Sequence, residues 1–252
     1  MNTKDQNLGL WYYKTFFYTF ERECDSFLNA TWENTIVQKV ELSYSQKMTT
    51  LYPGLVCGIG YEHELKIDKE LKLGLSFDFT TGQPYIPGSS IKGVLRQAFR
   101  DKAFVQYASN KAGIHTEGID WGKLENDIFE SITYEEQKPK CPYKTDVFFD
   151  AFIVGTYKGN DKKILSDDCI ACHQDWNKPS DTSKDINVIR FLKVRSGVTF
   201  LFGFRLFDTI IKGGITITAG IKKELFIQIL ELWGVGAKTN VGYGQLKRDD
   251  NE

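Results

Sequence analysis

Apolar residues in the first part of the chain change their spacing from one segment to the next. Residues 8–20 are apolar on nearly every face, which favours a buried helix. A mixed pattern over residues 31–44 indicates a helix running toward Lys39. Between residues 71 and 79 apolar and polar positions alternate with period two, as in a half-buried strand. Helical spacing returns after a turn-rich loop, from Ser89 onward, and the hydroxyl of Ser89 would cap this helix.

The second half alternates short apolar runs with polar stretches. Residues 110–143 and 155–185 are polar and irregular, and we interpret both as surface insertions. Apolar runs flank Ser196-Gly197, which predicts a tight hairpin. The elements expected here are strands at 146–154, 186–194, 198–207 and 215–219, an amphipathic helix at 222–233, and a glycine-rich loop at 234–246 leading into a last strand.

The order of these elements predicts the fold class. Strand, helix, strand, hairpin, strand, helix and strand form two split βαβ units, which together make a ferredoxin-like α+β fold with an antiparallel sheet. A length of 252 residues is compatible with one large domain. We therefore expect a single domain over residues 1–252, in which residues 1–45 form an N-terminal helical extension.

Composition excludes several classes of protein. Lys and Arg number 32 against 33 Asp and Glu, which excludes a strongly basic histone-like protein and an acidic disordered tail. Apolar residues make up 41% of the chain, enough for a packed core rather than intrinsic disorder. The five cysteines are an odd number and suggest a reducing compartment. With no apolar run long enough to cross a bilayer and no signal-like start, we expect a cytoplasmic protein without a membrane partner.

The helix that starts near Ser89 is the first candidate for chemistry. Lys92, Arg96 and Arg100 are spaced four residues apart and form one basic row. The row leads from a helix N-terminus, where free amides and the positive end of the dipole suit a phosphate. Ser89 and Ser90 would add hydroxyls to such a site. The alternative is a solvated basic face behind an ordinary serine cap.

The glycine-rich loop is the second candidate. Residues 234–244 hold four glycines in eleven positions, which lets a ligand approach the backbone closely. The spacing matches neither a P-loop nor a dinucleotide fingerprint. The alternative is a glycine helix cap followed by a bulged turn. From the two segments, the candidate RNA-binding residues are Ser89, Ser90, Lys92, Arg96, Arg100, Gly236, Lys238, Thr239 and Asn240.

Metal and catalytic motifs are weak. Cys169, Cys172 and His173, with Cys141 upstream, invite a zinc interpretation. Adjacent residues such as Cys172 and His173 seldom reach one metal, so we expect no metal and no cofactor. No histidine lies beside a serine or cysteine in the manner of a nucleophile and its base, so we expect no catalytic residue; the three are His63, His115 and His173.

Together, the glycine-bearing segments carry a family resemblance. The stretches YPGL at 52–55, GIGY at 58–61, residues 72–96 and the loop at 234–244 resemble the RAMP superfamily of CRISPR proteins. Within it they are similar to the sixth subunits of the type III-B Cmr effector complex. Residues 148–152 and 168–173 match in character, and the likeness covers most of 7–247. It departs at Cys169, at Cys172 and in the insertion at 110–143.

The resemblance implies a modified ferredoxin-like, RRM-like RAMP fold and an RNA-binding subunit in antiviral RNA interference. Such a subunit holds guide RNA near its 3′ end, packs against backbone subunits and other Cmr subunits, and meets target RNA only indirectly. Cleavage in such complexes belongs to another subunit, so the resemblance implies that this chain is not an enzyme. Two alternatives stay open: a metal-independent CRISPR RNA-processing endonuclease with a histidine base on the same fold, and a protein-interaction module.

Overall fold

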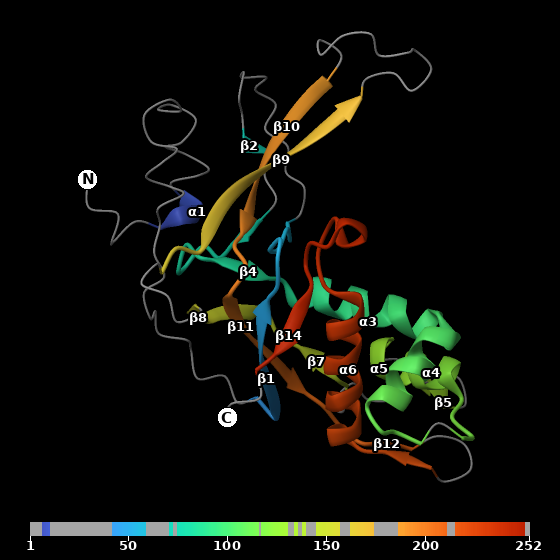
Figure 1. Cartoon of the computed structure of the whole chain (residues 1–252). Helices are drawn as coiled ribbons and strands as arrows, with labels where there is room; N and C mark the ends of the chain where they lie inside the picture. The colour runs from blue at the N-terminus through green and yellow to red at the C-terminus, as the bar shows by residue number, and fades with distance from the viewer. Residues whose placement is uncertain are drawn as a thin grey trace.

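A computed structural model gives the fold of the chain (Figure 1). It describes residues 7–10, 42–58, 71–72, 75–115, 117–130, 134–135, 138–139, 145–156, 162–173, 186–210 and 215–249. In the first part the described helix is α1 (Leu8–Leu10). The rest of the helices expected at 8–20 and 31–44, and most of the extension at 1–45, lie outside the described residues.

The main sheet has seven strands in the order β14-β1-β11-β8-β4-β3, with β7 also paired to β11. All of its pairs are antiparallel. Helix α3, which directly follows β4, lies in the chain between β1 and β8, and helix α6 lies between β11 and β14. In the sheet β11 separates β1 from β8, and β1 separates β11 from β14, so each connection crosses over one strand. This is the predicted ferredoxin-like arrangement of two split βαβ units. The bounds are β1 Tyr44–Thr50, β3 Ser76–Phe77, β4 Pro84–Ile86, β7 Val147–Phe148, β8 Ala151–Thr156, β11 Val198–Arg205, β14 Leu246–Arg248, α3 Gly88–Arg100 and α6 Ala219–Trp233.

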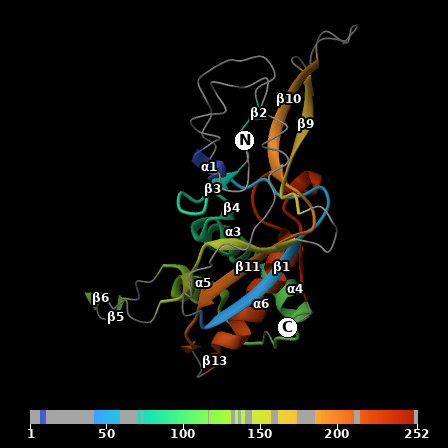
Figure 2. The same cartoon turned by 90° about the vertical axis from the view of Figure 1, so that its left-hand side faces the viewer.

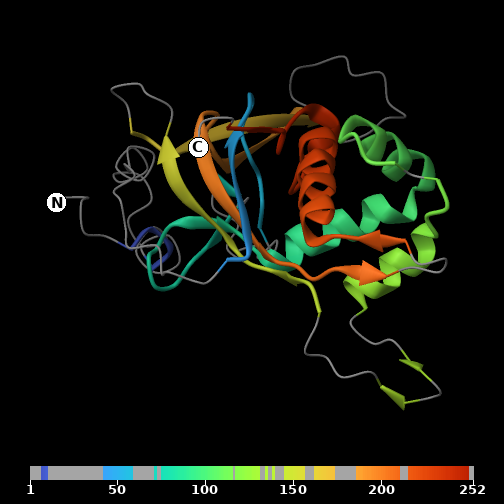
Figure 3. The same ribbon diagram turned by 90° about the horizontal axis from the view of Figure 1, so that it is seen from below.

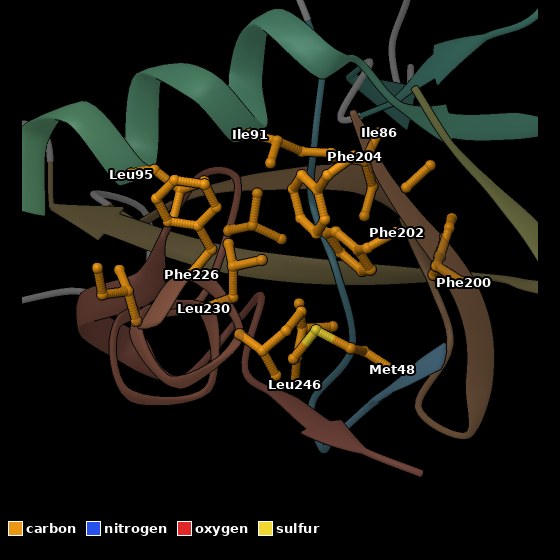
Figure 4. Close-up of a cluster of buried hydrophobic side chains, with 14 of the residues drawn as sticks. Met48, Ile86, Ile91, Leu95, Phe200, Phe202, Phe204, Phe226, Leu230 and Leu246 are labelled. Atoms are coloured by element: carbon orange, nitrogen blue, oxygen red, sulfur yellow. The ribbon is translucent and has the colours of Figure 1, made fainter. Parts of the chain in front are cut away.

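The helices cover one face of the main sheet, and the core lies between them (Figures 1 and 3). Residues at alternate positions of β11 point toward the helices, because a strand turns successive side chains to opposite faces. In Figure 4, Phe204 lies beside Ile91 of α3, and Phe202 and Phe200 follow along β11. The fully buried members of this contact are Phe200, Phe202, Phe204, Phe226, Ile91 and Leu95.

A second sheet of three strands, in the order β2-β10-β9, reaches away from the helical layer (Figures 1 and 2). Strands β9 (Leu165–His173) and β10 (Ile186–Val194) pair antiparallel over their whole length. Strand β2 (Leu71–Lys72) is parallel to β10. Two small ribbons complete the set: β5 (Tyr134–Glu135) with β6 (Lys138–Pro139), and β12 (Thr209–Ile210) with β13 (Thr216–Ile217).

Several strand predictions need correction. The run at 71–79 is not one strand, because β2 joins the second sheet and β3 the main one. Its last residue, Phe79, is 91% exposed rather than half buried. The strands on either side of Ser196-Gly197 do not form a hairpin, since β10 pairs with β9 and β11 with β1 and β8. Strand β1, which lies between β14 and β11, was not predicted from the sequence.

The two predicted insertions hold ordered elements. Residues 110–143 contain the end of α4 (Lys102–Lys111) and all of α5 (Trp121–Phe129), whose Leu124 and Ile128 are buried in the core. Residues 155–185 contain β9, which pairs residue by residue with β10. Helix α6 and the final strand agree with the prediction, except that α6 starts at Ala219, capped by Thr218. Among the described residues, no helix is long and apolar enough to span a membrane.

Candidate nucleic-acid interface

Backbone amides at the N-terminus of α3 already have hydrogen-bond partners within the chain. Pro87, not Ser89, is the N-cap, and it makes no side-chain cap. The amide of Gly88 donates to Asp150 Oδ1 at 2.7 Å, and the amide of Ser90 donates to the Pro87 carbonyl at 2.9 Å. A carboxylate of this chain therefore already binds the first amide, and phosphate binding at this turn stays a prediction. Ser89 is exposed at this turn.

In the basic row on α3, the two arginines form ion pairs with acidic side chains, whereas the lysine lies one turn away from them. Arg96 Nε lies 3.3 Å from Glu125 Oε1, and the Arg96 guanidinium also pairs with Glu130. Arg100 Nε lies 3.4 Å from the same Glu125 oxygen. These two arginines bind α5 to α3, and their role in RNA binding stays a prediction. Lys92, one turn nearer the N-terminus, is half buried and remains a candidate for a phosphate contact.

The glycine-rich loop is held tightly against the segment 52–57. The amide of Ala237 donates to the Val56 carbonyl at 2.7 Å, and the amide of Gly244 donates to the Gly54 carbonyl at 2.8 Å. At Gly236 (φ 92°) a Cβ atom would lie 2.3 Å from the Val56 carbonyl oxygen. This glycine is therefore required by the chain's own backbone, whereas the helix cap is Gly234, the C-cap of α6.

The tip of the same loop projects outward. Lys238 and Asn240 are exposed, and Thr239 is half buried in the short 3₁₀ turn Thr239–Val241. Lys238 adopts a left-handed backbone (φ 61°), which is uncommon for a residue with a side chain. The tip thus presents a lysine, a hydroxyl and an amide on a rigid support, all groups that bind phosphate and sugar oxygens.

Cys57 joins the two predicted segments. Its side chain is hydrogen-bonded to Ser90 at the start of α3. A Cβ atom at Gly236 would lie 3.3 Å from Cys57 Cβ, so the loop touches the other side of the same residue. Burial raises the pKa of the Cys57 thiol to about 11, which keeps it protonated. The structure therefore brings the α3 N-terminus and the glycine-rich loop together around Cys57.

A polar cluster that the sequence analysis missed ties the loop to the second sheet. Asp168 on β9 accepts hydrogen bonds from Lys193 Nζ and from the Tyr243 hydroxyl, both at 2.6 Å. These donors hold the pKa of Asp168 down to about 2. Phe191 packs edge-on against Tyr243, and Lys238 Nζ lies 5.4 Å from the centre of the Phe191 ring. No local sequence pattern links these residues, because β9, β10 and the loop meet only through the fold.

The structure adds no support for the weak catalytic and metal-binding motifs. Cys169 is exposed, and it lies with Cys172 inside a paired strand rather than in the turn that a zinc-binding Cys pair uses. Among the described residues, no three His, Cys, Asp or Glu side chains are grouped to hold a metal ion. His115 is exposed between α4 and α5. Cys141 and His63 lie outside the described residues.

The architecture defines the class: an RRM-like, ferredoxin-like α+β protein with a glycine-rich loop after α6 and a projecting strand pair. The chain belongs to the RAMP superfamily, whose family model matches residues 47–247. No relative among curated proteins matches the sequence.

Solved structures of CRISPR proteins match the chain at low identity. A chain of the cryo-EM structure of the type III-B Cmr-beta bound to cognate target RNA is 20% identical, with a TM-score of 0.50 over 82% of this chain. The match covers 58% of that chain, so this protein spans less than two thirds of its length. Cmr6 from Pyrococcus furiosus is 22% identical, with a TM-score of 0.36 over 82% of this chain and 97% of that one. A chain of a type IV-B CRISPR complex is 10% identical, with a TM-score of 0.42 over 82% and 91%.

Proposed function

We propose that this chain is a subunit of a type III-B CRISPR effector complex and that it holds guide RNA. Membership of the RAMP superfamily supports a place in a CRISPR complex. The observation that carries the RNA-binding role is the exposed tip at Lys238, fixed by backbone hydrogen bonds beside the start of α3. Contacts of this kind reach phosphates and sugars, so they accept any guide sequence.

The finer assignment rests on the sequence resemblance. The chain acts as the sixth subunit, binds near the guide's 3′ end, packs against backbone and other Cmr subunits, and meets target RNA indirectly. It is a binding subunit and not an enzyme. The buried thiol of Cys57 suits the reducing cytoplasm, where this complex would work.

Two lysines test the RNA-binding role. The double variant Lys92→Ala/Lys238→Ala should bind RNA more weakly than the parent. For a single strand, each lost phosphate contact reduces the magnitude of the slope of log K against log salt by about 0.7. Binding of the full chain to labelled repeat-derived RNA is measured over a salt series. Lys111→Ala is the matched control, because Lys111 is an exposed lysine at the far end of α4. The control should bind with the parent slope.

The alternatives give different results in the same experiment. Cleavage of the repeat RNA by the purified chain, lost in His115→Ala or in the equivalent variants of His63 or His173, would identify a processing nuclease. Absence of RNA binding by the chain, alone and with its partner subunits, would leave a protein-interaction module. A double lysine variant that binds like the parent at every salt concentration would place the RNA elsewhere.

A further inference from the structure

An exposed aromatic ring lies beside the glycine-rich loop. Tyr52 is 86% exposed, and Leu51 next to it is 42% exposed. Val241, at the end of the loop's 3₁₀ turn, is 66% exposed. These three side chains, together with Lys238, are here called the Tyr52 patch.

The backbone under the patch is firmly held. The amide of Gly54 donates to the Leu51 carbonyl at 2.8 Å, closing the turn that carries Tyr52. The amide of Leu51 donates to the Gln245 carbonyl at 2.9 Å, which ties this turn to the end of the glycine-rich loop. A Cβ atom at Gly242 would lie 3.4 Å from Pro53 Cδ, so the two loops are in contact. An exposed ring on such a support presents its face without first having to order a loop.

A cation and an exposed aromatic ring thus lie on two loops that are in contact. Lys238 lies on the same short turn as Val241, and the Tyr243 amide donates back to the Lys238 carbonyl at 3.3 Å. Among the described residues Lys238 makes no ion pair, and its ammonium lies over the Phe191 ring. Lys193 nearby is already neutralised by Asp168. The charge left for a ligand at this edge is therefore positive.

We propose that Tyr52 is a stacking platform for one nucleobase of single-stranded RNA whose backbone is bound at Lys238. This inference rests on the proposed RNA-binding function and adds a contact to the base. Every base has a π face, so stacking holds the strand without selecting a sequence. The aromatic ring and the lysine supply the two interactions that single-strand binding sites combine.

A protein partner fits the patch less well. A stable protein interface buries about 800 Å² on each partner, whereas the apolar part of the patch consists of three side chains on two adjoining turns. The adjoining lysine is the kind of charge that protein interface cores exclude. A single base with its phosphate matches both the small size and the charge.

The test compares RNA with and without bases. The probes are a labelled oligouridylate and the same oligomer carrying abasic sugars throughout. Stacking on one aromatic ring should make Tyr52→Ala bind the base-bearing probe about 5- to 100-fold more weakly than the parent. Tyr52→Phe should bind like the parent, because it keeps the ring. Tyr107→Ala is the control, since Tyr107 is a 51% exposed tyrosine on α4.

The abasic probe separates stacking from damage to the loop. The parent and Tyr52→Ala should bind it equally, with the same salt slope, because no phosphate contact changes. Equal binding of the base-bearing probe by the parent and Tyr52→Ala would refute the stacking platform while leaving the RNA-binding role intact. A parent chain that binds neither probe would refute the RNA-binding role itself. A Tyr52→Ala variant that binds both probes normally but no longer joins its partner subunits would make the patch a protein contact, and that also overturns the proposal.

Discussion

Replacing Lys222 should reveal how much the structure depends on one buried ion pair. Lys222 Nζ on α6 lies 2.6 Å from Asp146 Oδ2, and each side chain is only 2% exposed. The other carboxylate oxygen of Asp146 accepts the Phe207 amide at 2.9 Å. The pair therefore fixes the start of α6 to the chain just before β7 and just after β11.

The size of the effect follows from burial. Lys222→Met removes the cation and leaves the Asp146 carboxylate buried without its counter-charge, which costs about 3–5 kcal/mol of unfolding free energy. Replacing both partners with apolar side chains, as in Lys222→Met with Asp146→Leu, removes the stranded charge. That double variant should therefore be more stable than Lys222→Met alone. Lys223→Met is the matched control, because Lys223 is the next lysine on α6 and 21% exposed, and it should cost less than about 1 kcal/mol.

The assay is urea unfolding of the full chain at pH 7 and at pH 5. Burial raises the pKa of Asp146 above its ordinary value, and Lys222 only partly opposes this. A raised folded-state pKa means that protonation favours the folded state, so stability falls as pH rises through that pKa. Without Lys222 the pKa rises further, and the deficit of Lys222→Met should shrink at the lower pH. A loss below about 1 kcal/mol at pH 7, or a deficit that does not change with pH, would refute this reasoning.

Two further substitutions test the loop and the polar cluster. Gly93→Ala should stabilise the chain by about 0.5–1 kcal/mol, because a Cβ atom at this position of α3 meets nothing within 4 Å. Gly236→Ala should destabilise it by more than about 1 kcal/mol. Urea unfolding measures both changes. Asp168→Asn should lower the melting temperature near pH 6. This deficit should fade as pH falls from about 4 to about 2, because Lys193 holds the folded-state pKa below its ordinary value of 3.8 and that contribution is lost on protonation.

Local pattern and element order were enough to predict the frame of the fold. Helical spacing located α3 and α6 to within a few residues, and the alternation of strands and helices gave the ferredoxin-like class. Pairing was predicted less well, because it depends on distant segments. The turn at Ser196-Gly197 has hairpin chemistry, yet β10 matches β9 over nine residue pairs and its neighbour β11 is taken by β1 and β8.

In the candidate site, too, local spacing was predicted correctly and contacts between distant segments were not. Spacing alone predicted that Lys92, Arg96 and Arg100 share one side of a helix. Spacing could not show that Glu125 binds both arginines, since Glu125 lies in a stretch that its polarity suggested was an insertion. Tyr52 begins the YPGL stretch of the family resemblance, but that stretch does not mark its ring for binding. The ring becomes a candidate because its turn packs on the glycine-rich loop.

Lys238 offers a way to separate loop conformation from phosphate binding. Its φ of 61° is strained for a residue with a Cβ atom, by roughly 1–2 kcal/mol, and glycine would relieve this strain. Part of the gain is lost because glycine also makes the unfolded chain more flexible. Lys238→Gly should therefore be as stable as Lys238→Ala or up to about 1 kcal/mol more stable, since both variants lose the contact with Phe191.

RNA binding should not follow the order of stability, because neither variant carries the lysine ammonium. We expect Lys238→Gly and Lys238→Ala to bind single-stranded RNA equally weakly, each with a salt slope about 0.7 smaller than that of the parent. Unfolding curves and a binding series on the same samples measure both quantities. If Lys238→Gly bound like the parent, the loop's backbone rather than its lysine would hold the strand. A strained conformation kept by a lysine, where glycine would be easier, is best explained by what the lysine binds.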